Sequence, residues 1–345
     1  MGILAPITWR IPPRAYGPWE YVAGSLARGL VERGYDVVLF ATADAETPAR
    51  LEAVCPGPLG EREDLPPRPC ELMHVAHALK RAEELGLDLL HNHMNYLPLP
   101  FTPLVSVPVL TTLHGAALLE ADSRFLYRRY PHLPYVSISY AERQGAPELR
   151  YVANVYNGID LADFTFVERP GSYLLFLGRL SPVKGPDLAI EVARRTGFPL
   201  KLAGPVPPED REFFEAKIRP HVNGRSIEYV GEVGPRERDR LLGGALALLH
   251  LVRAPEPFGL VMVEAMATGT PVIGMARGSV PEVVEDGVTG FVVEDLEGAV
   301  RAVPRVAGLR RAEARRRVEE RFTLDHMIEG YVRAYETVLA EQGER

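Results

Sequence analysis

The chain has 345 residues, of which 46% are apolar and 25% are charged, and its formal net charge is −7. This length exceeds one typical hydrophobic core and indicates about two domains of an ordinary globular protein. The negative charge argues against a nucleic-acid binder that works by neutralising phosphates. No run approaches the roughly 18 apolar residues of a membrane span, and the N-terminus lacks a signal-peptide layout. The two cysteines form neither a disulfide framework nor a metal motif, so we expect a cytoplasmic protein.

The first half of the chain alternates short apolar runs with amphipathic helical stretches. A predicted strand, GILAPITW, is followed by a Pro-rich loop and by a helix over 19–33 that Gly34 ends. Continuous apolar strands joined by helices are typical of a parallel sheet covered on both faces. The further predicted strands in this half are YDVVLFA, DLLHNH, PVLTTLH, YVSIS and VANVYNG.

The same alternation begins again after a stretch of little periodicity at 158–171, which we interpret as a linker. We therefore predict an α/β protein with two doubly wound domains, 1–160 and 170–322, that face each other across a cleft. The last helix, 324–342, carries an apolar stripe and is expected to cross back onto the first domain. The predicted strands of the second half are SYLLFLG, LKLAG, IEYVG, ALLHLV, PVIG and GFVV.

Two cations lie on a glycine-bracketed loop directly after a predicted strand. In GRLSPVKG, Arg179 and Lys184 lie between Gly178 and Gly185. Ligands of open parallel sheets lie beyond the carboxyl ends of the strands. Arg can fork to two oxygens of an anion and Lys acts as a point charge, so this loop predicts a pyrophosphate site. A solvated basic loop is the alternative.

A second group of candidate residues follows the predicted strand ALLHLV. In EPFGLVMVE, Glu256 lies on a loop before a helix that starts near Leu260, and Glu264 lies inside that helix, which is otherwise apolar nearly all round. The start of the helix suits a phosphate, and carboxylates accept hydrogen bonds from the vicinal hydroxyls of a ribose or hexose. We therefore expect ligand hydroxyls to satisfy the buried Glu264. A structural carboxylate bonded to neighbouring backbone is the alternative.

The first domain offers fewer signals. His114 ends the predicted strand PVLTTLH, where it can carry a proton or bond a substrate, although many histidines are satisfied core residues. Gly17 precedes the first helix. His91 and His93 lack the further ligands of a metal site, and the sequence has no Asp-x-Asp. We therefore predict no metal, and we expect protein cations to neutralise the pyrophosphate.

Together these motifs resemble the retaining glycosyltransferases of family 4, which have the GT-B fold, over nearly the whole chain. The most specific match is EPFGLVMVE, which has the family's two glutamates separated by seven residues, with Phe-Gly after the first. The runs GRLSPVKG, YNGID and PEVVEDGVTGFVV are similar to three further motifs of the family.

The resemblance implies a role for each matching residue. Arg179 and Lys184 would hold the donor's diphosphate, Glu256 would bond the donor sugar, and Glu264 would bond the ribose. His114 would contact the donor sugar or the acceptor, and it forms the expected catalytic group together with Glu256, Arg179 and Lys184. Three further groups are expected to contact the donor. Gly17 would do so from the first-domain loop, and the backbone of Glu232 and Val233 would contact the base. The backbone of Phe258, Gly259 and Leu260 would contact the phosphates or sugar.

Two features depart from the family pattern. The first-domain loop of the family commonly carries Gly-Gly, whereas here it reads Gly17-Pro18. Pro18 has no N–H for a phosphate, although it suits a first helical turn. The first strand also begins almost at Met1, which makes it shorter than usual.

The implied reaction moves a hexosyl group from a nucleotide-diphosphate sugar to an acceptor, with retention, without metal or cofactor. A UDP-sugar is the first choice of donor over GDP-mannose and ADP-glucose. The acceptor, whether small molecule, lipid or glycan, stays open, as does peripheral contact with a membrane. The alternatives are a GT-B sugar-nucleotide epimerase or hydrolase and a non-catalytic nucleotide-sugar-binding protein. A dinucleotide-dependent dehydrogenase is disfavoured because the sequence has no Gly-x-Gly-x-x-Gly.

Overall fold

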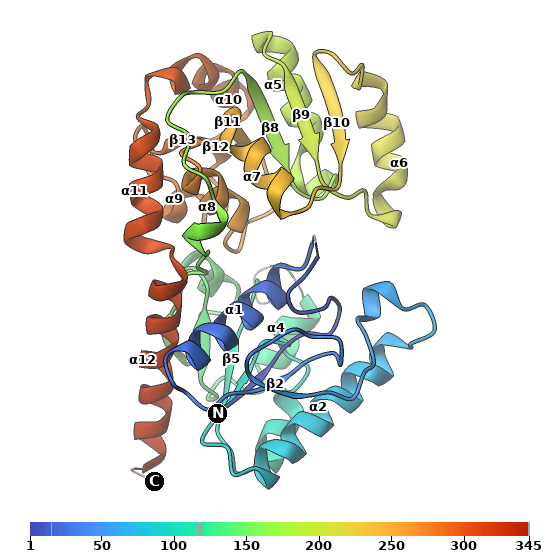
Figure 1. Ribbon diagram of the computed structural model, residues 1–345, viewed down its shortest axis with the longest axis vertical. Helices are drawn as coiled ribbons and strands as arrows, with labels where there is room; N and C mark the ends of the chain where they lie inside the picture. The colour runs from blue at the N-terminus through green and yellow to red at the C-terminus, as the bar shows by residue number, and fades with distance from the viewer. Residues whose placement is uncertain (15, 116–118, 120, 344–345) are drawn as a thin grey trace. The chain divides into compact units, whose positions relative to one another are not determined.

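The chain folds as two compact units in a computed structural model that describes residues 1–14, 16–115, 119 and 121–343. Unit 1 is Met1–Gly158 together with Leu324–Arg345, and unit 2 is Ile159–Thr323. Each unit has one parallel sheet with helices packed on it (Figure 1). These two Rossmann-like sheets confirm the predicted α/β class with two doubly wound parts.

The sheet of unit 1 has seven strands in the order β3-β2-β1-β4-β5-β6-β7, and each pair is parallel. Strand order reverses between β1 and β4, which are direct neighbours. The strands are β1 (Gly2–Leu4), β2 (Val38–Phe40), β3 (Arg50–Glu52), β4 (Leu90–Asn92), β5 (Val109–Thr112), β6 (Tyr135–Ser137) and β7 (Tyr151–Asn154).

The C-terminal helix belongs to unit 1, where α12 packs on α1 and β7 (Figure 1). The two helices approach closely at Gly29, because a Cβ there would lie 2.1 Å from Cδ1 of Ile328. A side chain at position 29 would therefore require the end of the Ile328 side chain to move. The α-helices of this unit are α1 (Pro18–Glu32), α2 (Pro67–Glu84), α4 (Ala121–Tyr127) and α12 (Leu324–Gly343).

The sheet of unit 2 has six parallel strands in the order β10-β9-β8-β11-β12-β13, and its order reverses between β8 and β11. The strands are β8 (Tyr173–Leu177), β9 (Leu200–Ala203), β10 (Ile227–Gly231), β11 (Ala245–His250), β12 (Val272–Met275) and β13 (Gly290–Val293). The α-helices are α5 (Pro186–Thr196), α6 (Arg211–Phe213), α7 (Pro235–Gly243), α8 (Leu260–Ala267), α9 (Val280–Val283), α10 (Leu296–Ala302) and α11 (Arg311–Arg321).

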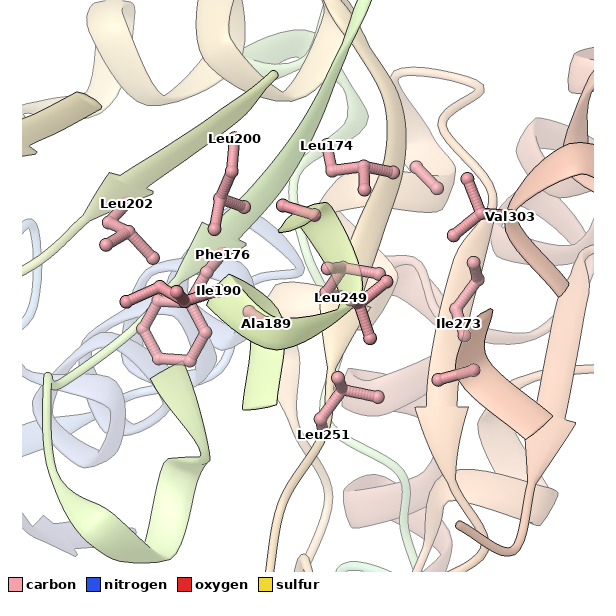
Figure 2. Close-up of a cluster of buried hydrophobic side chains, with 14 of the residues drawn as sticks. Leu174, Phe176, Ala189, Ile190, Leu200, Leu202, Leu249, Leu251, Ile273 and Val303 are labelled. Atoms are coloured by element: carbon pink, nitrogen blue, oxygen red, sulfur yellow. The ribbon is translucent and has the colours of Figure 1, made fainter. Parts of the chain in front are cut away.

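The core of unit 2 lies between its sheet and the helices on it. Figure 2 shows Phe176 of β8 and Leu202 of β9 beside Ile190 of α5, and all three side chains are buried. All six residues of β11 are buried, as expected for a central strand covered on both faces. This packing fixes the carboxyl ends of β8 and β11, where the candidate site is built.

Two strands differ from the sequence predictions. The first strand ends at Leu4 rather than near Trp9, because Pro6 has no N–H with which to continue the ladder. The short strand β3 was not predicted, since its Arg50 and Glu52 do not carry the apolar pattern of a buried strand. Among the described residues, no helix is long and apolar enough to span a membrane.

Candidate active site

The candidate site of unit 2 lies where its strand order reverses. Arg179 and Lys184 follow β8, and Glu256 follows the neighbouring strand β11. In doubly wound sheets such a switch point leaves a crevice at the carboxyl ends of the strands, where ligands bind. The structure thus brings together the loops that the sequence analysis treated as two separate signals.

The Lys184 ammonium meets the Glu256 carboxylate directly, with Nζ 2.6 Å from Oε2. Lys184 ends a short 3₁₀ turn, Pro182–Lys184, and its side chain is half-buried. Two polar atoms of the same loop, Arg179 Nε and Ser181 Oγ, are buried and have no hydrogen-bond partner within the described part of the chain. Since buried polar atoms are rarely left unpaired, this loop has hydrogen-bonding capacity available for a ligand.

Glu256 is ionised at neutral pH. Burial alone would raise the pKa of its carboxyl, but Lys184 and His250 together lower the pKa to about 2. His250 Nε2 lies 3.1 Å from Glu256 Oε2, although outside hydrogen-bond geometry. Sequence reasoning missed His250. The signal that could have found it is a polar residue ending the otherwise apolar strand β11, six residues before Glu256.

The loop after Glu256 leads into the start of α8. Phe258 is buried and Gly259 caps the helix, which begins at Leu260, so the positive end of its dipole lies beside Glu256 in the chain. Ser279 holds this loop, because its Oγ donates to the Phe258 carbonyl and its N–H to the Glu256 carbonyl. A Cβ at Gly278 would lie 2.2 Å from that Glu256 oxygen, so only glycine permits this approach.

Glu264 has a partner that the sequence did not reveal. Its Oε1 lies 3.1 Å from Nη1 of Arg238, a residue of α7 whose guanidinium also lies over the ring of Phe164, 5.9 Å from the ring centroid. Burial raises the pKa of Glu264, Arg238 opposes the rise, and Asp163 adds to it. Arg238 Nε is buried without a hydrogen-bond partner among the described residues. The pair therefore keeps a donor available for a further group.

Glu232 and Val233 follow β10, which lies at the edge of the sheet, two positions from β8. Glu232 is exposed, whereas Val233 is buried. Within the described part of the chain, no hydrogen bond or ion pair joins either residue to the Lys184–Glu256 pair.

Unit 1 holds the remaining two predicted residues, Gly17 and His114. Gly17 is buried and caps α1, directly before Pro18. His114 lies two residues beyond the end of β5 and is buried, and its φ of 44° is a left-handed conformation uncommon for histidine. Such conformations concentrate at functional sites.

The turn at His114 is held from two sides. The Trp19 ring of α1 stacks on the His114 ring with their centroids 5.8 Å apart. Glu142 accepts hydrogen bonds from the N–H groups of Gly115 and Ile138. Burial raises the pKa of Glu142 to about 7, and burial lowers the pKa of His114 to about 3. His114 is therefore a neutral imidazole at physiological pH.

His91 and His93 lie beside His114 in a hydrogen-bonded chain, with His93 Nδ1 2.8 Å from His114 Nε2 and His93 Nε2 3.2 Å from His91 Nδ1. No group of three or more His, Cys, Asp or Glu side chains in the described ranges could hold a metal ion. The partners of these histidines are one another and hydroxyl groups.

Comparison with known proteins identifies the family. A model of glycosyl transferases group 1 matches residues 165–321, and a model of glycosyltransferase family 4 matches residues 20–163. D-inositol 3-phosphate glycosyltransferase of Geodermatophilus obscurus is 29% identical over 92% of this chain and 84% of its own length. Glycogen synthase of Mycobacterium tuberculosis is 28% identical over 98% of this chain and 95% of its own length.

A solved structure shows the same fold. The crystal structure of Anabaena HepE in complex with UDP and glucose matches with a TM-score of 0.76 and 19% identity, covering 98% of this chain and 100% of that one. The two family models together match most of the chain, one in each half, and both name the same class of enzyme. The chain belongs to the group 1 glycosyltransferases of family 4 and is a glycosyltransferase.

Proposed function

We propose that the enzyme transfers a hexosyl group from a nucleoside-diphosphate sugar to an acceptor hydroxyl, with retention of anomeric configuration and without a metal ion. The observation that carries this proposal is the contact between Lys184 and Glu256 at the switch point of unit 2, on the loop that also carries Arg179 and on the loop that leads into α8. A cationic loop and a helix N-terminus suit a diphosphate, and an ionised carboxylate suits the hydroxyls of a sugar.

Breaking the bond between sugar and diphosphate develops negative charge on the leaving oxygen. Arg179, Lys184 and the first backbone N–H groups of α8 stabilise that charge from fixed positions, which is the largest single contribution in many such sites. Glu256, held ionised beside Lys184, accepts hydrogen bonds from the sugar. Phe258, Gly259 and Leu260 contribute backbone groups.

The nucleoside part of the donor lies along the other predicted residues. Glu264, held by Arg238, accepts from the ribose hydroxyls, and the backbone of Glu232 and Val233 contacts the base. From unit 1, Gly17 and His114 contact the donor, with His114 at the sugar or the acceptor. A UDP-sugar is the first choice because the similar HepE structure holds UDP and glucose.

The reducing cytoplasm is the proposed location, because Cys55 and Cys70 are both free thiols. The enzyme needs no cofactor in this scheme, and the donor is its substrate.

Donor and reaction are tested together. The enzyme is mixed with UDP-glucose, GDP-mannose or ADP-glucose, alone and with D-inositol 3-phosphate or glycogen, the acceptors suggested by the names of its relatives. We expect release of the nucleoside diphosphate that depends on one donor and one acceptor, with an α-linked product by NMR. Release without an acceptor-linked product indicates a hydrolase, and isomerised sugar indicates an epimerase. Binding of a donor without any turnover indicates a binding protein.

A further inference from the structure

A continuous chain of hydrogen bonds runs through unit 1 from His114 to the C-terminal helix. His114 Nε2 meets His93 Nδ1 at 2.8 Å, and His93 Nε2 meets His91 Nδ1 at 3.2 Å. His91 Nδ1 also lies 2.8 Å from the hydroxyl of Tyr335, which α12 supplies. His91, His93 and His114 are buried, as is Tyr335. Of the residues in this hydrogen-bonded chain, only His114 belongs to the donor contacts proposed above.

The other ring nitrogen of His91 is also bonded. His91 Nε2 lies 2.8 Å from Thr112 Oγ1, at the end of β5, and Thr112 Oγ1 donates to the hydroxyl of Tyr331, 3.2 Å away. Burial holds the pKa of His91 and His93 well below its usual range, as it does for His114. Each ring is therefore neutral and carries one N–H, so a proton placed on one ring dictates the placement on the next.

The Tyr335 hydroxyl determines which group donates and which accepts in each hydrogen bond of this series. Within the described residues, its acceptor is His91 Nδ1, so the hydroxyl proton points to that nitrogen and leaves it without a hydrogen of its own. The single proton of His91 then sits on Nε2 and is donated to Thr112. His93 Nε2 lies 3.2 Å from the same His91 Nδ1, and two bare nitrogens would repel each other, so His93 carries its proton on Nε2. His91 Nδ1 has one lone pair, which the Tyr335 hydroxyl at 2.8 Å and the more distant His93 Nε2–H share.

The same reasoning reaches His114. With its proton on Nε2, His93 has a bare Nδ1, which accepts a hydrogen bond from the Nε2–H of His114. His114 Nδ1 is then a bare nitrogen that is buried and has no hydrogen-bond partner in the part of the chain that the structure describes. Trp19 fixes the plane of the ring, so the direction of this lone pair is fixed as well.

We propose that His93, His91 and Tyr335 are positioning residues that hold His114 in the tautomer protonated on Nε2, so that Nδ1 accepts a hydrogen bond from a substrate hydroxyl. The inference rests on the proposed function for one point, the placement of His114 at the substrate. It adds that this contact takes a donor hydroxyl and does not offer an N–H. It also makes α12 part of the site, through Tyr335.

The tautomer is measured by NMR on the full-length enzyme labelled with ¹⁵N-histidine, since ring nitrogens with and without hydrogen differ widely in shift. The His114 signals are assigned by their loss in His114→Gln. We expect one neutral form of His114, protonated on Nε2. A form protonated on Nδ1, or an even mixture, overturns the proposal whatever the substrate is.

A matched pair of variants tests the chain itself. His93→Asn keeps a polar atom near Nδ1 that can bond His114, whereas His93→Leu has nearly the same shape and none. We expect His93→Leu to give two tautomers of His114 and His93→Asn to keep one. Tyr335→Phe removes only the hydroxyl that sets the direction, and we expect mixed tautomers there too. An unchanged His114 spectrum in both His93→Leu and Tyr335→Phe overturns the proposal.

His74 provides the control. It is buried, and its Nε2 bonds the carbonyl of Ala5, so it takes no part in the hydrogen-bonded chain from Tyr335 to His114. His74→Leu removes a buried histidine from the same unit, so we expect the His114 spectrum to stay unchanged. A change as large as that of His93→Leu means that loosened packing moves the tautomer, and it overturns the proposal.

Turnover separates this inference from the proposed function. UDP release from UDP-glucose, with water or an acceptor, should fall about tenfold in kcat in His93→Leu, the factor that one hydrogen bond is worth. KM should change little, and His93→Asn should stay within about threefold of wild type. Full turnover in His114→Gln overturns the placement of His114 at the substrate. Loss of turnover in His114→Gln but not in His93→Leu overturns the positioning role alone.

Discussion

The Glu264 carboxylate lies 3.1 Å from the guanidinium of Arg238, which joins α8 to α7 at the site. A glutamate inside an apolar helix is thereby paired within the protein, before any ligand binds. The pairing is incomplete, because burial still holds the pKa of Glu264 above its usual range. A further donor at this carboxylate, such as a ribose hydroxyl, would complete it.

Glu264→Gln should weaken the binding of UDP by about 1.5–3 kcal/mol, the range for a hydrogen bond to a charged group. The variant keeps the shape of the side chain, and Arg238 is partly exposed, so we expect its unfolding midpoint to change little. Calorimetry with UDP and with its 2′,3′-dideoxy analogue on both proteins measures the effect. The dideoxy compound should bind the variant and wild type almost equally. Equal losses for both nucleotides mean that Glu264 acts on the fold and not on the ribose.

Arg179→Ala and Lys184→Ala should each lower kcat at least about 100-fold, the usual loss when a fixed charge contact to a leaving group is removed. Steady-state release of the nucleoside diphosphate gives the measurement. Arg195→Ala is a matched control, because Arg195 is a cation of the same unit that pairs with Glu297 at an exposed position. Near-normal turnover in both site variants, with the control also normal, rules out the diphosphate assignment.

Turnover should survive an excess of EDTA. Arg179, Lys184 and the start of α8 supply positive charge where the diphosphate is proposed to leave, so no divalent cation is needed to stabilise it. The assay compares the chelated enzyme with enzyme given Mg²⁺ or Mn²⁺. Complete loss with EDTA that either ion restores contradicts the prediction.

Acidification below pH 6.5 should destabilise unit 1. Burial lowers the pKa of four histidines in the folded unit below the ordinary 6.5, so the unfolded chain binds more protons there and stability falls as pH falls. Glu20 and Glu142 oppose this, because burial raises their pKa to about 7. The unfolded chain therefore binds at most two more protons than the folded unit, which limits the loss of unfolding free energy to about 3 kcal/mol per pH unit. The four histidines are His74, His91, His93 and His114.

Urea unfolding at pH 5, 6 and 7 measures this slope. Trp9 and Trp19, the two tryptophans of the chain, both lie in unit 1, so their fluorescence follows that unit. In His74→Leu one of the four histidines is gone, and the slope should drop by about 1.4 kcal/mol per pH unit. A stability that is flat or rises toward pH 5 in the wild type contradicts the assignment of neutral buried histidines.

The sequence predicted the parts of the fold and site that depend on neighbouring residues. Arg179, Lys184 and Glu256 were selected as candidates because glycines, a proline and the ends of apolar runs mark the loops that carry them. The start of α8 at Leu260 followed from the break at Pro257 and Gly259, and the return of the last helix followed from its apolar stripe.

Contacts between side chains that lie far apart in the sequence could not be predicted from glycines, prolines or apolar spacing. The helix α7 reads PRERDRLLG and carries three arginines, and only its packing beside α8 decides that Arg238 is the one facing Glu264. Likewise Tyr335 meets His91 across 244 residues of sequence. From the sequence alone, the HNH run at 91–93 was only a pair of histidines with no further metal-binding residues at a recognisable spacing. The role proposed for these histidines depends on contacts that only the tertiary fold creates.

Because unit 1 combines residues from before and after unit 2, its last helix is synthesised only after the whole of unit 2. Unit 2 is continuous, from Ile159 to Thr323, and can fold as soon as it leaves the ribosome. The first 158 residues emerge earlier, but their unit is complete only once α12 has followed, since Ile328 of this helix faces Gly29 and Tyr335 meets His91. A chain that ends after Thr323 therefore contains all of unit 2 but lacks α12 of unit 1. In such a chain His91 has no Tyr335 partner, so the hydrogen bonds that lead to His114 lose their first donor.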